Sequence, residues 1–429
     1  MDMDYTLAVD LGTSGAKVTL VSMHGTVVGW EAEDVPLLLT PDGGAEQRPQ
    51  DWWQAITRAA RRLLARDLAP LSAVRAVCCS TQGEGTVAVD REGQALMNCI
   101  LWMDMRGAPL LRKNVQGLIN VAGYDPLKLA RWIRLTGGLP SLTGKDPSAH
   151  MLLIKERYPQ VYEKTYKFLN VLDYINLRLT GRFTATVDSI LTSWVTDNRN
   201  PDHVCYDPVL QRYSGIDADK FPEIVACMEV LGPLSAAASA DLGLPQTVQV
   251  VAGSIDNTAA AIGSGAVDLY VPHVYIGTSS WISAHVPAKK TDFISYLAST
   301  PCAVPGRFLL TALQATAGGN LTYLKEKILY HKDELMLEEN VPDVYKVMDR
   351  IAEQVPAGSN GVIYTPWIWG ERAPVDNPHM RAGLYNLSLN NNRADIIRAF
   401  LEGVAYNTRW LVEPVEKFIG RKLEYIHLV

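Results

Sequence analysis

The stretch that decides the fold is TLAVDLGTSGAKVTLVS, residues 6–22. Hydrophobic residues alternate along both of its halves, which predicts two short β-strands joined by a turn. Gly12 and Gly15 are expected to give this turn its conformational freedom. Two interpretations stay open: a plain hairpin, or a loop whose backbone N–H groups hold phosphate oxygens. In the second case Asp10, at the edge of the turn, would repel the phosphate unless Mg²⁺ lay between them.

The bulk composition limits the classes of function. A length of 429 residues suggests two or three domains, and 48% hydrophobic with 20% charged residues is typical of a globular protein with a large core. A net charge of −6 argues against a nucleic-acid partner. The densest basic run, RAARRLLAR at 58–66, has helical spacing and is interpreted as the solvated face of an amphipathic helix.

Targeting and redox signals favour a cytoplasmic protein without a membrane partner. The N-terminus MDMDYT lacks the pattern of a signal peptide, and no run reaches the ~18 apolar residues of a membrane helix. The six cysteines show no C-x-x-C spacing, which indicates reduced thiols.

A second copy of the opening pattern predicts two related lobes. Residues 273–286, HVYIGTSSWISAHV, repeat the order strand, Gly-Thr-Ser, strand. The segment VQVVAGSIDNTAAAIGSG, residues 248–265, runs from strand to helix and is interpreted as the joint between the lobes. We therefore expect domains at 1–265 and 266–429, each offering a hairpin to a shared cleft. Asp256, at the joint, could cap the following helix, accept a proton from a hydroxyl group that attacks a γ-phosphoryl group, or do both.

Other phosphate-binding motifs are absent from the sequence. It contains no G-x-x-x-x-G-K-[ST] and no G-x-G-x-x-G between a strand and a helix. Phosphate chemistry would therefore depend on the two hairpins.

Several longer stretches resemble the FGGY family of carbohydrate kinases, within the actin, hexokinase and Hsp70 ATPase superfamily. The resemblance lies in DLGTSGAKV (10–18), ILWMDMRG (100–107), LDYINLRLTGRFTATVDS (172–189), YIGTSS (275–280) and GERAPVDNPHMRAGLYNLSLNNNRADIIRAFLEGVAYNTRWL (370–411). It implies an α/β fold of two ribonuclease-H-like lobes with an interlobe cleft. It also implies binding of ATP with Mg²⁺, and transfer of the γ-phosphate to a small sugar or polyol.

The resemblance also implies roles for single residues. Asp10 matches the acid that is linked to Mg²⁺ through water, and Asp256 matches the catalytic base. Side chains at the small residues near 318 would be expected to collide with the nucleotide phosphates. The residues that match the ATP-binding positions are Gly12, Thr13, Ser14 and Lys17, then Gly277, Thr278 and Ser279, then Gly318 and Gly319.

The segment expected to recognise the sugar differs in sequence from that of the better-known members of the family. Xylulose kinases carry Gln-Met-His-Gly and glycerol kinases an Arg-Glu pair where this sequence reads STQGEGTVAVD, residues 80–90. A pentulose such as xylulose is the expected substrate. The alternatives are a polyol of the erythritol or glycerol type, a catalytically impaired sugar-binding or regulatory relative, or another ATPase of the superfamily. The candidate substrate-binding residues are Gln82, Glu84, Trp102, Asp104, Arg106, Asp256 and Asn257; Glu84 could instead be a turn residue, and Trp102 a core aromatic.

The resemblance carries an expectation about the end of the sequence. In the family a Gly-rich segment that stacks on adenosine follows the signature helix, and the sequence stops at Val429 before it. We therefore expect these residues to bind sugar, to bind ATP weakly and to turn over slowly. A homodimer is considered, and the sequence leaves the oligomeric state open.

Overall fold

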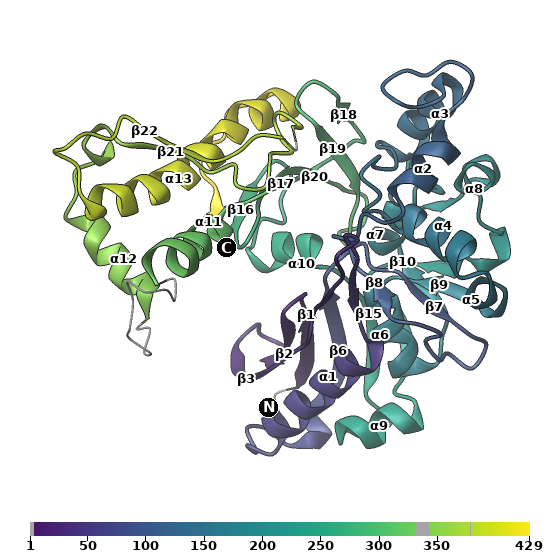
Figure 1. The fold of residues 1–429 in the computed structure, drawn as a ribbon. Helices are drawn as coiled ribbons and strands as arrows, with labels where there is room; N and C mark the ends of the chain where they lie inside the picture. The colour runs from purple at the N-terminus through teal and green to yellow at the C-terminus, as the bar shows by residue number, and fades with distance from the viewer. Residues whose placement is uncertain (1–3, 331–342, 378) are drawn as a thin grey trace. The chain divides into compact units, whose positions relative to one another are not determined.

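A computed structural model describes residues 4–330, 343–377 and 379–429 (Figure 1). The chain divides into two compact units: unit 1 comprises Met1–Ala259 with Thr300–Phe308, and unit 2 comprises Ala260–Ser299 with Leu309–Val429. Each unit contains a six-stranded sheet with helices, which confirms the α/β prediction. The expected domain limits, 1–265 and 266–429, stay predictions.

The opening stretch forms the predicted hairpin in the sheet of unit 1. Strands β1 and β2 pair antiparallel, with Val9 opposite Val18 and Asp10 opposite Lys17. Strands β1, β6 and β15 are parallel neighbours, so their carboxyl ends meet at one edge of the sheet. The sheet runs in the order β14 (Val230–Pro233), β15 (Gln249–Ile255), β6 (Val74–Thr81), β1 (Tyr5–Leu11), β2 (Gly15–Ser22) and β3 (Val27–Asp34).

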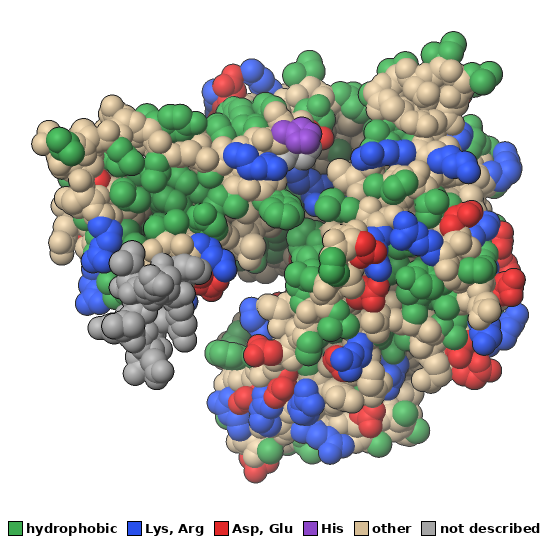
Figure 2. Space-filling view, viewed as in Figure 1, with side chains coloured by type: hydrophobic (Ala, Val, Ile, Leu, Met, Phe, Trp, Pro, Cys, Tyr) green, Lys and Arg blue, Asp and Glu red, His purple; other side chains and the backbone are tan. Residues whose placement is uncertain are grey.

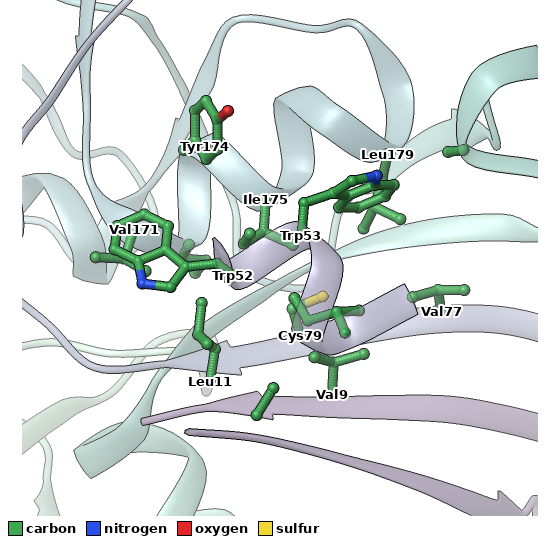
Figure 3. Close-up of a cluster of buried hydrophobic side chains, with 14 of the residues drawn as sticks. Val9, Leu11, Trp52, Trp53, Val77, Cys79, Val171, Tyr174, Ile175 and Leu179 are labelled. Carbon is green, nitrogen blue, oxygen red and sulfur yellow. The ribbon is translucent and has the colours of Figure 1, made fainter. Parts of the chain in front are cut away.

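Two helices, α1 (Pro49–Leu64) and α6 (Val171–Thr180), supply the largest side chains of the core of unit 1. Figure 3 shows Trp52 of α1 beside Val171 of α6 and Trp53 of α1 beside Leu179 of α6, with the strand residues Leu11 and Val9 below them in this view. Because side chains alternate along a strand, the residue between Val9 and Leu11 faces the opposite side of the sheet. That residue is Asp10, which is exposed.

The basic run forms the outer face of α1, as predicted. Arg58, Arg62 and Arg66 make ion pairs with Glu31 and Glu33 of β3. Figure 2 shows basic and acidic side chains interspersed over this region. Exposed pairs of this kind contribute at most about 1 kcal/mol each. The run is therefore an ion-paired helix face, as expected of a solvated surface.

The rest of unit 1 consists of short helices and two- or three-stranded sheets, and many of their buried residues form a second hydrophobic cluster. Trp132 and Met151 are among its fully buried members. The helices are α2 (Ala108–Val115), α3 (Pro126–Thr136), α4 (Pro147–Arg157), α5 (Pro159–Lys164), α7 (Val187–Ile190), α8 (Pro208–Ser214) and α9 (Ala236–Leu242). The strands are β4 (Leu38–Leu39), β5 (Ala45–Gln47), β7 (Val87–Val89), β8 (Cys99–Ile100), β9 (Lys167–Leu169), β10 (Thr184–Thr186), β11 (Thr196–Asp197), β12 (Cys205–Tyr206) and β13 (Glu223–Val225).

Unit 2 repeats the hairpin arrangement, which confirms the predicted internal repeat. Strands β16 and β17 pair antiparallel around the turn 277–279, and β16 pairs parallel with β23, as β1 does with β6. The sheet runs in the order β18 (Thr291–Asp292), β19 (Leu297–Pro301), β20 (Phe308–Gln314), β17 (Ser280–Val286), β16 (Pro272–Ile276) and β23 (His427–Leu428). The other elements are α10 (Asp256–Gly263), which spans the boundary of the units, α11 (Gly318–Tyr323), α12 (Val344–Glu353), β21 (Ile363–Thr365), β22 (Gly383–Tyr385) and α13 (Arg393–Ile419). Within the described ranges, no helix has the length and apolar character needed to span a membrane.

Candidate functional site

The turn between β1 and β2 is tight because of its neighbours. Gly12 N donates to Gly15 O at 2.9 Å. A Cβ atom on Gly15 would lie 2.4 Å from the backbone oxygen of Glu33 in β3. The expectation that the two glycines provide conformational freedom was wrong, because neither has a positive φ. The close approach of β3 explains the glycine at position 15 instead. Ser14, in the same turn, and Lys17, in β2, have exposed side chains.

Asp10 lies in a polar row across the three parallel strands. Asp10 of β1 is in register with Ser80 of β6, and Ser80 with Ser254 of β15. Desolvation raises the pKa of Asp10, while the positive charge of Lys17 and a hydrogen bond with Ser80 oppose the increase. The row places an accessible carboxylate at the edge where β6 and β15 also end.

Asp256 follows β15 directly and begins α10. A shift of register in β15 precedes it, where Gly253 has φ +77° and a Cβ atom would lie 2.0 Å from the Cys79 carbonyl oxygen. Asn257 N donates to Asp256 Oδ1 at 2.7 Å, so the carboxylate also bonds the first turn of the helix.

The environment of Asp256 makes it an unusually basic carboxylate. Burial raises its pKa to about 6; the Asn257 N–H lowers it, and the charges of Asp10 and Asp188 raise it. The side chain is thus ionised at neutral pH while being a stronger base than an ordinary aspartate. Of the predicted residues, the structure brings Asp10 and Asp256 close enough to interact electrostatically.

A hydrogen-bonded network joins three other candidates. Thr13 Oγ1 donates to Gln82 Oε1 at 2.7 Å and accepts from Trp102 Nε1 at 3.1 Å. Gln47 bonds both Thr13 and Gln82: its Nε2 donates to Thr13 O at 2.7 Å, and its Oε1 accepts from Gln82 Nε2 at 2.9 Å. The same Oε1 also accepts from Trp52 Nε1 at 3.0 Å. The network fixes the turn after β1 against the loop after β6.

Sequence reasoning missed Gln47. It lies in the three-residue strand β5, and its partners Thr13 and Gln82 are 34 and 35 residues away. No motif surrounds it that would have suggested a role, because only the folded chain brings these polar groups together.

Glu84 has an unusual backbone conformation. Its φ is +59°, in the left-handed region, where a non-glycine residue costs on the order of 1 to 3 kcal/mol. The next residue, Gly85, is closely packed, since a Cβ atom there would lie 2.5 Å from Val171 Cγ2. The protein therefore holds Glu84 in a conformation that its side chain disfavours.

Asp104 and Arg106 are engaged inside the protein. Asp104 is 0% exposed, and its Oδ2 accepts from Ala45 N at 2.9 Å and from Arg106 Nη2 at 2.6 Å. Arg106 Nη2 also bonds Glu46 Oε1 at 2.6 Å. Both side chains thus hold β5, the strand that carries Gln47. Their predicted contact with substrate hydroxyl groups stays a prediction.

The predicted second phosphate loop lies in unit 2, between β16 and β17. Gly277 N donates to Ser279 O at 2.9 Å, Gly318 N to Gly277 O at 2.7 Å, and Gly319 N to Thr278 O at 3.1 Å. The first residues of α11 therefore pack on this loop.

The same contact gives a physical reason for the two glycines of α11. A Cβ atom on Gly318 would lie 2.6 Å from Gly277 O, and one on Gly319 would lie 3.1 Å from Thr278 O. The protein's own backbone thus disfavours a side chain at both positions, and the expected collision with a nucleotide stays a prediction.

Comparisons with known proteins agree on one family. Residues 5–263 match the N-terminal domain of the FGGY family of carbohydrate kinases, and residues 273–429 match its C-terminal domain. The chain is 28% identical to a xylulose kinase of Bacillus subtilis (strain 168) over 97% of this chain and 78% of that protein. It is 27% identical to a gluconokinase of the same strain, over 94% and 75% respectively.

Solved structures show the same fold. The crystal structure described as a xyloylose kinase from Brucella ovis aligns with a TM-score of 0.83 at 23% identity, covering 99% of this chain and 81% of that one. This likeness confirms the predicted α/β fold with a sheet in each of two lobes.

Proposed function

Because this chain belongs to the FGGY family of carbohydrate kinases, we propose that it transfers the γ-phosphoryl group of ATP to a hydroxyl group of a ketopentose such as xylulose. As a carbohydrate kinase it uses ATP and a sugar or polyol as substrates. The ketopentose is supported by similarity to proteins named xylulose kinase. The single observation that carries the mechanism is the half-buried carboxylate of Asp256, at the ends of parallel strands, with a pKa raised to about 6.

Asp256 acts as the general base in this proposal. One of its oxygens accepts the proton of the attacking hydroxyl group as that oxygen forms a bond to the γ-phosphorus atom. The bond from the γ-phosphorus atom to the oxygen that bridges it to the β-phosphate breaks, and that oxygen leaves on ADP. A pKa near 6 suits this role, because the base is ionised at pH 7 and still binds a proton readily.

Asp10 fits a Mg²⁺ ion that is bound through water. Its carboxylate is exposed at the edge of the sheet, next to a predicted phosphate loop. Among the described residues no group of three or more His, Cys, Asp or Glu side chains could hold a metal ion. Mg²⁺ commonly keeps several waters and takes one or two carboxylates together with substrate phosphates. When bound there, it would neutralise charge on the phosphates.

We assign the phosphate contacts within each unit separately. In unit 1 they fall on the turn Gly12–Ser14 and on Lys17, whose exposed side chain lies opposite Asp10. In unit 2 they fall on Gly277–Ser279, with Gly318 and Gly319 supporting that loop from α11. Free backbone N–H groups in turns of this kind favour phosphate oxygens.

We assign sugar recognition to the loop after β6 and its neighbours. Glu84 can accept from two adjacent hydroxyl groups, and its left-handed backbone supports a functional reason for its presence. Gln82 and Trp102 are assigned beside it because they bond the turn after β1, and Asn257 because it follows the base. Asp104 and Arg106 would support this group from β5.

An assay of ADP release with a panel of sugars tests the substrate. We expect the highest kcat/KM with xylulose or another ketopentose, and much lower values with gluconate, glycerol and erythritol. If a polyol or gluconate were the best substrate, the proposed ketopentose specificity would be wrong, and the proposed kinase activity would stand. Binding of the sugar without ADP release, measured by calorimetry, would instead indicate an impaired sugar-binding relative.

The setting of the enzyme follows from its chemistry. An ATP-dependent reaction, and six cysteines that form no disulfide, favour the cytoplasm. A homodimer is the assembly to test first, by light scattering.

A further inference from the structure

The carboxylate of Asp188, in α7, lies beside the strand-to-helix joint that carries Asp256. Asp188 is 2% exposed, and its Oδ2 accepts a hydrogen bond from Ile255 N at 3.0 Å. The side chain of Thr258 also hydrogen-bonds to Asp188. These two contacts bracket Asp256, one on the residue before it and one two residues after it.

The other oxygen of Asp188 is held by neighbouring elements. Oδ1 accepts from Thr186 Oγ1 at 2.7 Å and from Cys227 Sγ at 3.3 Å. All of these hydrogen bonds come from neutral groups. Burying a carboxylate among neutral donors is costly, and a neutral acceptor would support the fold at lower cost. What distinguishes Asp188 from another buried carboxylate is that two of its partners flank Asp256.

We propose that Asp188 is a positioning residue for the general base: it holds the backbone N–H of Ile255 and the side chain of Thr258, which flank Asp256, and so keeps that carboxylate in place for the attacking hydroxyl group. This inference rests on the proposed function of Asp256. A catalytic group that is displaced by about 1 Å can lose on the order of 100-fold in rate. Loss of the tether should thus lower kcat and leave the binding of sugar almost unchanged.

Asp173 provides a matched control. It is 1% exposed and bonds Ser189 Oγ at 2.8 Å, Thr186 N at 3.2 Å and Asn170 N at 3.2 Å. None of these partners belongs to β15 or α10. Asp173 is therefore an equally buried carboxylate of the same region that shares Thr186 with Asp188 but bonds none of the described residues of β15 or α10.

The first experiment compares Asp188→Ala, Asp188→Asn and Asp173→Ala. Rates are measured at pH 8, above the pKa of about 6 of Asp256, so that the ionisation of the base does not interfere. We expect Asp188→Ala to lower kcat on the order of 10- to 100-fold with little change in the KM for sugar. Asp188→Asn should recover most of the rate, because its amide oxygen can still accept from Ile255 N. Asp173→Ala should lower the melting temperature and leave kcat of the folded enzyme almost unchanged.

The second experiment repeats Asp188→Ala in an Asp256→Asn background. If Asp188 acts through Asp256, its removal should cost little further rate there. Equal losses of kcat in both backgrounds, or wild-type kcat for Asp188→Ala, would overturn the positioning role. A near-wild-type rate for Asp256→Asn alone would instead overturn the proposed base, so the two failures are distinguishable.

A third variant keeps the test valid if Asp188→Ala does not fold. Thr258→Val removes one tether, together with the 3.4 Å hydrogen bond from Thr258 Oγ1 to Asn257 Oδ1, and leaves the buried carboxylate its other partners. We expect a severalfold lower kcat that disappears in the Asp256→Asn background, and an unchanged kcat for Thr258→Val would overturn the proposal.

Discussion

The contact between α11 and the loop after β16 predicts a sharp effect of Gly318→Ala. The new Cβ atom would lie 2.6 Å from Gly277 O, and ordinary contact begins at 3.4 Å, so the backbones must separate by about 0.8 Å. Overpacking of this kind costs about 1 to 3 kcal/mol. If the loop holds phosphates of ATP, that cost should appear in nucleotide binding, as a KM for ATP that increases on the order of 10- to 100-fold.

Gly263→Ala is the matched control for this prediction. Gly263 ends α10, and a Cβ atom there would meet nothing within 4 Å. Alanine favours a helix by up to about 1 kcal/mol over glycine, so this variant should be as stable as the wild type or more so, with unchanged kinetics. The assay is ADP release with ATP varied at saturating sugar, next to thermal melting of each variant. A Gly318→Ala enzyme that folds and keeps the wild-type KM for ATP would refute the assignment of this loop to phosphate.

Three further predictions follow from unit 1. The value of kcat should fall as pH drops through about 6, because protonation of Asp256 removes the base, and a flat profile between pH 5 and 8 would argue against it. Glu84→Gly should raise the melting temperature, by relieving a left-handed residue that costs on the order of 1 to 3 kcal/mol, and should raise the KM for the best sugar; equal losses with every sugar would mean that Glu84 does not distinguish substrates. Asp10→Ala should increase the Mg²⁺ concentration needed for half-maximal rate while the protein stays folded, as circular dichroism can check, and an unchanged Mg²⁺ dependence would return Asp10 to a structural role.

Local sequence patterns were sufficient to predict the elements that carry the candidate site. The alternation of residues 6–22 predicted the β1–β2 hairpin, and the repeated Gly-Thr-Ser predicted its counterpart in unit 2. The strand-to-helix joint at Asp256 was also predicted, because apolar strand residues, a polar pair and an alanine-rich helix follow one another directly.

Contacts between distant parts of the chain could not be predicted in the same way. Gln47 and Asp188 have no local signature, since each acts through partners that only the folded chain brings near. The sequence did not indicate that the oxygens of Asp104 bond β5 and Arg106, and its predicted contact with a substrate stays a prediction. Gly15 was explained by freedom of φ and Gly318 by the ligand, and neither explanation included the backbone oxygen atoms that closely approach these two glycines. A sequence shows the type of a residue and not which atoms surround it.

The ratio of kcat for the wild type to kcat for Asp256→Asn, at saturating ATP and xylulose, tests the central claim most directly. Removal of a general base typically costs on the order of 10² to 10⁴ in rate, and the binding of sugar should stay close to that of the wild type. We therefore predict xylulose-dependent ADP release by the wild type and a ratio of at least about 100. A ratio near one would contradict the account, because the half-buried carboxylate at the joint of β15 and α10 would then not take part in phosphoryl transfer.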